Sequence, residues 1–171
     1  MARDLEYDAG TIKRWLDVLQ NLFVIFKVSP WSKKITKSLR KTSKYYFFDT
    51  ARVKNGDGAR LENLTACALL KELHRVKDQF GVSGALHFLR TRDGRELDFL
   101  VALEGEPYLI VESKWSEDQF SPHFAWFSAF FDLDKVASVQ IVAEAKMERQ
   151  SPSGTRLLRA ARWLSGISFK A

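Results

Sequence analysis

Apolar and polar residues recur along this chain with two periods, one helical and one extended. Near the start, Trp15 and Leu19 fall at helical spacing, which predicts a short helix over residues 11–20. Two runs rich in aromatic and β-branched residues, 22–28 and 45–48, are predicted strands. The first third is therefore expected to read helix, strand, loop and strand.

The remainder alternates a long helix with a series of strands. Residues 60–80 predict a helix with two apolar rows, ended by Gly81. Phenylalanines from 120 to 131 recur at helical spacing, and residues 156–164 predict a closing amphipathic helix. The predicted strands are 85–91, 95–103, 107–115 and 136–143.

These elements predict an α/β protein in which a mixed four-stranded sheet is flanked by helices. The turn cluster Asn-Gly-Asp-Gly at 55–58 is a plausible boundary. We therefore expect a basic segment, 1–58, resembling the C-terminal half of a winged helix, and an α/β domain over 59–171.

Charge changes this picture, because it is distributed unevenly. The net charge is +6, and residues 1–58 hold 12 Lys and Arg against 6 Asp and Glu, whereas the rest of the chain is balanced. Such an excess points to a polyanion such as nucleic acid, with a merely solvated surface as the equal alternative. The candidate phosphate contacts are Lys33, Lys34, Lys37, Arg40, Lys41 and Lys44.

Other totals narrow the class of protein. The single cysteine, Cys67, excludes an internal disulfide, and no apolar run approaches the roughly 20 residues of a membrane span. The first ten residues have no apolar signal-peptide core. We expect a cytoplasmic protein with no membrane partner.

Candidate chemistry lies on the two strands that flank the loop at 104–106. Glu112 and Lys114 are two residues apart and share a strand face. A three-residue loop pairs positions whose numbers sum to 210, so Asp98 is expected opposite Glu112. Facing carboxylates repel unless a cation lies between them. Glu62, at the start of the long helix, could add a further carboxylate.

Hard oxygen ligands without nearby histidine or cysteine predict Mg²⁺ or Mn²⁺ on Asp98 and Glu112. In phosphodiester hydrolysis such a metal would polarise the phosphoryl oxygen and activate water, and Lys114 would stabilise developing charge. Taken alone, a Glu-x-Lys triplet is more often a surface pair. The order of helix acid, hairpin Asp and Glu-x-Lys favours the site.

At this point the segments ELDFLV and IVESKWS resemble the core motif of the PD-(D/E)xK nuclease superfamily. Together with KYYFFDT and RLENLTACALLKEL, they resemble the C-terminal domain of unknown function found in prokaryotic AAA-type ATP-binding proteins. This resemblance implies a restriction-endonuclease-like core. It matches Asp98 and Glu112 to the metal-binding acids, Lys114 to the motif lysine and Glu62 to the helix acid.

The chain departs from that family in two places. Ala51 and Arg52 stand where the family has a glycine after its FDT motif, and no Walker A segment occurs, so no ATP site is expected here. Three functions remain open: a Mg²⁺-dependent nuclease-like domain acting on DNA, a non-catalytic DNA-binding or regulatory module, and an interaction domain for an ATPase module.

Overall fold

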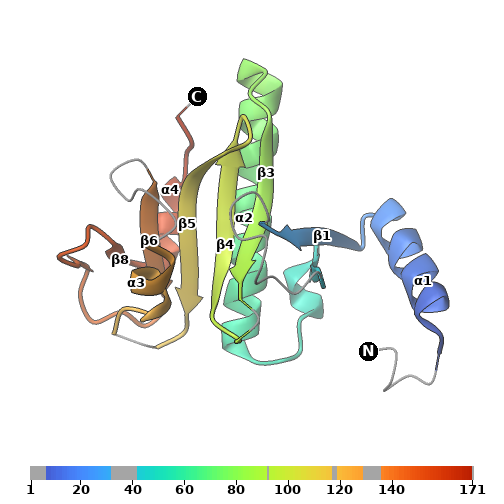
Figure 1. Ribbon diagram of the computed structural model, residues 1–171, viewed down its shortest axis with the longest axis horizontal. Helices are drawn as coiled ribbons and strands as arrows, with labels where there is room; N and C mark the ends of the chain where they lie inside the picture. The colour runs from blue at the N-terminus through green and yellow to red at the C-terminus, as the bar shows by residue number, and fades with distance from the viewer. Residues whose placement is uncertain (1–6, 32–41, 92, 117–118, 129–135, 171) are drawn as a thin grey trace.

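The computed structural model describes residues 7–31, 42–91, 93–116, 119–128 and 136–170 (Figure 1). Four α-helices, a short 3₁₀ helix and eight strands are described in these ranges. The helices are α1 (Ala9–Asn21), η1 (Thr50–Arg52), α2 (Asp57–Phe80), α3 (His123–Ser128) and α4 (Ala160–Gly166). The strands are β1 (Ile25–Pro30), β2 (Lys44–Phe47), β3 (Gly84–Arg90), β4 (Glu96–Leu103), β5 (Glu106–Lys114), β6 (Ala137–Val142), β7 (Arg149–Gln150) and β8 (Arg156–Arg159).

All eight strands form one mixed sheet in the order β2-β1-β3-β4-β5-β6-β8-β7. The four predicted strands of the α/β domain occupy its centre as β3 to β6. The prediction of only four strands is wrong, because β1 pairs in parallel with β3 through Ser29 and Pro30, and β8 pairs in parallel with β6. The α/β class and the flanking helices are confirmed.

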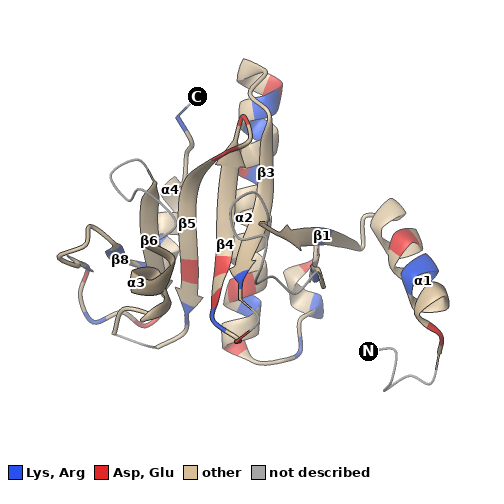
Figure 2. Ribbon diagram, viewed as in Figure 1, with Lys and Arg blue, Asp and Glu red and all other residues tan. Residues whose placement is uncertain are grey.

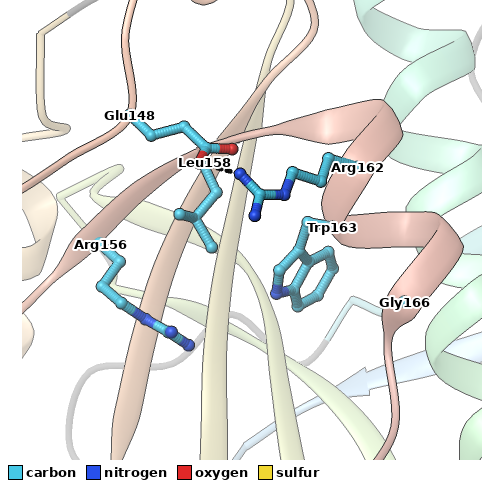
Figure 3. A pocket seen from close by; sticks show the side chains of 6 residues that line it. All are labelled: Glu148, Arg156, Leu158, Arg162, Trp163 and Gly166. Carbon is cyan, nitrogen blue, oxygen red and sulfur yellow. Dashed lines mark hydrogen bonds and ion pairs between the residues drawn. The ribbon is translucent and has the colours of Figure 1, made fainter.

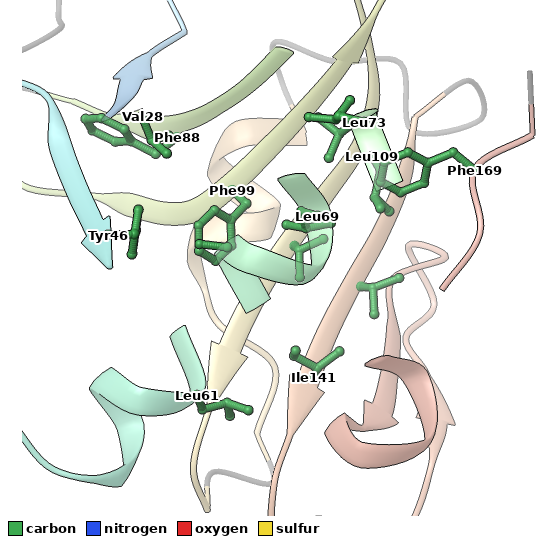
Figure 4. Close-up of a cluster of buried hydrophobic side chains, with 14 of the residues drawn as sticks. Val28, Tyr46, Leu61, Leu69, Leu73, Phe88, Phe99, Leu109, Ile141 and Phe169 are labelled. Atoms are coloured by element: carbon green, nitrogen blue, oxygen red, sulfur yellow. The ribbon is translucent and has the colours of Figure 1, made fainter. Parts of the chain in front are cut away.

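Helices cover both faces of the sheet (Figure 1). One face packs against α2 and α4, with Leu69, Phe99 and Ile141 fully buried between sheet and helices (Figure 4). The other face packs against α3 through Phe124 and Phe127. We call these the α2 face and the α3 face.

The start of the chain is built into this architecture. Helix α1 and strands β1 and β2 follow in the predicted order, and β1 and β2 form an antiparallel pair that extends the main sheet. Phe26, Val28 and Tyr46 belong to the core of the α2 face. Helix α1 is capped by Asp8, whose carboxylate accepts hydrogen bonds from the backbone N–H groups of Gly10 and Thr11.

The closing helix was predicted too long. Residues 156–159 form β8, and α4 begins only at Ala160. Leu157 is buried and Leu158 is half-buried, which is the burial pattern of a strand between two covered faces. Two adjacent leucines do not distinguish that strand from the first turn of a helix.

The β4–β5 connection produces the predicted register by a different route. Leu103 pairs with Glu106, so the turn has two residues, Glu104 and Gly105, both with positive φ as a tight hairpin requires. A register shift between Val101 and Ala102 then adds one residue. Beyond it Phe99 pairs with Val111 in the expected register, and Asp98 and Glu112 are the first positions past this last pair.

Asn63 ties α2 to the edge strand β2. Its side-chain oxygen accepts a hydrogen bond from the backbone N–H of Phe47 at 2.8 Å, and its amide donates to the carbonyl of Phe47 at 2.8 Å. Asn63 thereby replaces a neighbouring strand for one residue of the edge. The clamp fixes Glu62, its neighbour, against β2.

Among the described residues, no helix is both long enough and apolar enough to cross a membrane.

Replacement Asn63→Leu should therefore destabilise the fold. It leaves both backbone groups of Phe47 without the amide, and each buried polar group that loses its partner costs about 1–3 kcal/mol. We expect the free energy of unfolding in urea to fall by roughly 2–4 kcal/mol. The neighbouring Leu64→Ala, at an exposed position, should change it by only about 0.5 kcal/mol. Equal effects of the two substitutions would contradict the role of the clamp.

Candidate functional site

The predicted acids Asp98 and Glu112 lie just past the last pair of the β4–β5 ladder. The backbone N–H of Asp98 donates to Glu112 Oε2 at 3.1 Å, while Ser113 donates to Asp98 Oδ2 from its backbone N–H at 2.9 Å and from its hydroxyl at 2.8 Å. Each carboxylate therefore accepts a backbone hydrogen bond from the opposite strand. Figure 2 shows acidic and basic positions gathered at this end of β4, β5 and α2.

A β-bulge determines where Asp98 points. His87 pairs with Leu100 and Leu89 pairs with Leu97, so Asp98 and Phe99 together lie opposite Phe88. Leu97 and Leu100 both pack on the α3 face, whereas Phe99 packs on the α2 face. The carboxylate of Asp98 bonds Ser113, which alternates onto the α2 face with Val111.

The side chains of Glu112 and Lys114 leave β5 on the α3 face. They alternate with Ile110, which belongs to the α3-face core. Their side chains form an ion pair, with Lys114 Nζ at 3.0 Å from Glu112 Oε1. Asp98 and Glu112 thus approach the gap between β4 and β5 from opposite faces of the sheet, although their strand positions are opposite one another.

The α2 face holds a second set of charges around Lys44. The ammonium lies 2.8 Å from Glu62 Oε1, 2.5 Å from Glu96 Oε1 and 3.8 Å from Asp98 Oδ1. Tyr46 donates a hydrogen bond to the same Glu62 oxygen at 2.6 Å. We call Lys44, Glu62, Glu96 and Asp98 the Lys44 cluster.

Burial and charge shift the pKa values of these groups. Burial acts to lower the pKa of Lys44, but attraction to Glu62, Asp98 and Glu96 outweighs it and raises the pKa. Burial also acts to raise the pKa of Glu96, which hydrogen bonding from Arg90 and the charge of Lys44 instead hold below its usual value. The ammonium of Lys44 therefore stays charged beside ionised acid.

The two strand acids respond differently. Burial and then repulsion from Glu62 raise the pKa of Asp98, and Lys44 and Ser113 oppose this only in part. Burial and repulsion from Asp98 raise the pKa of Glu112 to about 7, against the opposing charge of Lys114. Strongly shifted carboxyls at a strand end are typical of functional sites, although structural networks also produce them.

The predicted metal does not fit this arrangement. Across the ranges that the structure describes, no group of three or more His, Cys, Asp or Glu side chains is placed to hold a metal ion. The acids are split between two faces, and the ammonium of Lys44 lies among those of the α2 face. The positive charge among the acids of the α2 face is the ammonium of Lys44.

The structure places Glu62 and Asp98 beside Lys44, and it pairs Glu112 with Lys114. Lys44 was assigned to a phosphate-binding run, whereas the structure places it among carboxylates. The other five of that run, Lys33, Lys34, Lys37, Arg40 and Lys41, lie outside the described residues. Glu96 and Tyr46 were missed. Glu96 could have been suspected, since it lies two residues before Asp98 on the same strand.

Two hollows are relevant to ligand binding. A cavity of about 290 Å³ beside the Lys44 cluster is lined by Lys44, Tyr46, Glu62 and Asn63, among others. A second, of about 270 Å³, lies between β8 and α4, where Arg156 and Trp163 point inward and Arg162 forms an ion pair with Glu148 at 3.0 Å (Figure 3). The first gives the Lys44 cluster contact with solvent.

Comparison with known families agrees with part of the sequence resemblance. A family model described as "Domain of unknown function (DUF4143)" matches residues 57–163. The chain belongs to this family. A second model, "Domain of unknown function (DUF8612)", matches residues 1–55. The DUF4143 match covers α2, β3 to β6 and most of α4, and so includes Glu62, Asp98, Glu112 and Lys114.

Two curated relatives extend the comparison. Uncharacterized protein Rv2008c of Mycobacterium tuberculosis and uncharacterized protein Mb2031c of Mycobacterium bovis are each 31% identical to this DUF4143 protein over 149 residues. The matched region covers 83% of this chain and 33% of each relative, so the chain spans about a third of their length. No solved structure matches.

The raised pKa of Glu112 predicts a pH-dependent stability. The folded state binds the proton more tightly than the unfolded chain, so the free energy of unfolding should fall as pH rises from about 4.5 to about 7. The cost is on the order of 3 kcal/mol above that range. Glu112→Gln should flatten this slope and stabilise the protein at pH 8.

Urea denaturation between pH 4.5 and 8 measures this effect. The exposed residue Glu144 supplies the control, since Glu144→Gln should keep the wild-type slope. A slope that survives Glu112→Gln unchanged would assign it to another group.

Proposed function

We propose that this chain is a non-catalytic protein-interaction module that docks on an ATPase-type partner. The proposal rests on the exposure and the backbone conformation of Phe23. This aromatic residue is 75% exposed and has a φ of 54°, a left-handed conformation that is strained for a bulky side chain. Strain of this kind persists where the surrounding structure enforces it, often at functional positions.

Phe23 is part of a larger apolar surface. Trp15, Val18 and Leu22 are exposed along α1 at intervals of three and four residues, and they lead to Phe23, whose ring lies 6.0 Å from that of Phe48. We call these five residues the α1 apolar surface. Contiguous exposed apolar surface of this kind is typical of protein–protein contact. In Figure 1, α1 projects from the body of the sheet, so the surface is open to a partner.

The class of partner follows from two considerations. The curated relatives continue for about two-thirds of their length beyond the matched region. The resemblance to C-terminal domains of AAA-type ATP-binding proteins favours an ATPase module in that further length of the relatives. The α1 apolar surface is then the surface on which we expect such a module to dock.

Phe23→Asn should separate folding from binding. Asparagine tolerates the left-handed conformation, so the melting temperature should remain within a few degrees of wild type. As a probe, we would use the part of the M. tuberculosis relative outside the matched region, produced as a separate chain. We expect calorimetric binding to the wild-type chain and at least a tenfold loss on Phe23→Asn.

The matched control is Phe80→Asn, at an exposed phenylalanine of α2, which should bind like wild type. Absence of binding by the wild-type chain, or equal binding by both variants, would overturn the proposal.

A metal-dependent DNA phosphodiesterase is the second candidate, favoured by the desolvation of Asp98 and Glu112. Asp98 and Glu112 would hold Mg²⁺ or Mn²⁺ in such an enzyme only after the acids rearranged onto one face. Incubation of wild type and Lys114→Ala with plasmid DNA and Mn²⁺ distinguishes the candidates. We expect no cleavage by either protein, and cleavage that depends on Lys114 would favour the enzyme instead.

A further inference from the structure

In the Lys44 cluster, three carboxylates lie together on the α2 face at the end of the sheet. Glu62 comes from α2, whereas Glu96 and Asp98 come from β4, and all three side chains are at least 70% buried. Partly desolvated carboxylates at such separations repel one another strongly unless a cation lies between them.

The cation is supplied by β2. Lys44 is the first residue of that strand, and its side chain is only 17% exposed. Its ammonium contacts oxygens from both other elements, at 2.8 Å on Glu62 and 2.5 Å on Glu96, with Asp98 at 3.8 Å. Arg90 contributes a second positive charge on the outer side of Glu96.

We propose that Lys44 is a tethered counter-ion that occupies the position of a divalent cation and keeps metal ions from the Lys44 cluster. Lysine places one positive charge among three acids, all of them hard oxygen donors of the kind that Mg²⁺ and Mn²⁺ prefer. Lys44 is thus a positioning residue for the cluster. This inference is independent of the α1 apolar surface and of any catalytic activity.

The geometry indicates that Lys44, and not Lys114, occupies the position that a metal ion could take. Lys114 also pairs with an acid, but that acid is Glu112, on the α3 face. Removing Lys44 leaves three carboxylates together without their shared ammonium. A metal ion that loses part of its hydration shell needs several protein ligands in return.

The test is direct binding of Mn²⁺ to the whole chain, followed by the electron paramagnetic resonance signal of free Mn²⁺. Wild type should bind Mn²⁺ weakly, and Lys44→Met, of similar length but uncharged, should bind at least tenfold more tightly. Mn²⁺ should also raise the melting temperature of Lys44→Met but not that of wild type. Lys27→Met, at an exposed position of β1, should bind like wild type.

Lys44→Met leaves three acids without their main counter-ion, and it could fail to fold at neutral pH. In that case Lys44→Met combined with Glu96→Gln lowers the repulsion, and this double variant should still bind Mn²⁺ more tightly than wild type. Refolding of Lys44→Met on addition of Mn²⁺ would support the proposal. Unchanged Mn²⁺ binding in both the single and the double variant would overturn it, as would tight binding by wild type.

Discussion

Repulsion among carboxylates at one desolvated end of the sheet is the constraint on which this structure depends. Glu62, Glu96 and Asp98 converge there from α2 and β4, and burial strengthens every charge–charge interaction. The ammonium of Lys44 from β2, with the guanidinium of Arg90 on Glu96, offsets this repulsion. The position of β2 is therefore an electrostatic requirement of the central strands as well as an extension of the sheet.

That requirement explains why the first third of the chain is built into the α/β domain. Asn63 holds the backbone of Phe47 from α2, and the adjacent Glu62 holds Lys44 and Tyr46, so one turn of helix fixes both ends of β2. The α1 apolar surface is attached to the same edge through β1, and Phe48 follows β2 directly. A partner bound to that surface would contact Phe48, the residue that directly follows the strand carrying Lys44.

The sequence predicts most of the central architecture because its signals are local. Periodicity predicts β3 to β6 and α2 within a few residues of their observed bounds. The edges of the sheet were missed because pairing of β1 with β3 joins residues some sixty positions apart. Lys44 was misassigned for the same reason, since a cationic run in sequence does not reveal that its last member turns inward to distant acids.

Two irregularities, an extra residue on β5 and a bulge on β4, decide what the acids can do, and they act in opposite directions. The shift between Val101 and Ala102 compensates for a turn of only two residues, and so restores the predicted alignment of Asp98 with Glu112. The bulge opposite Phe88 then turns Asp98 toward Ser113 on the α2 face, away from Glu112. Alignment in register alone would have placed two carboxylates on one face, where a divalent cation could bridge them. With the bulge, Asp98 joins Lys44 and Glu112 joins Lys114, so each acid meets a lysine where a shared metal was expected.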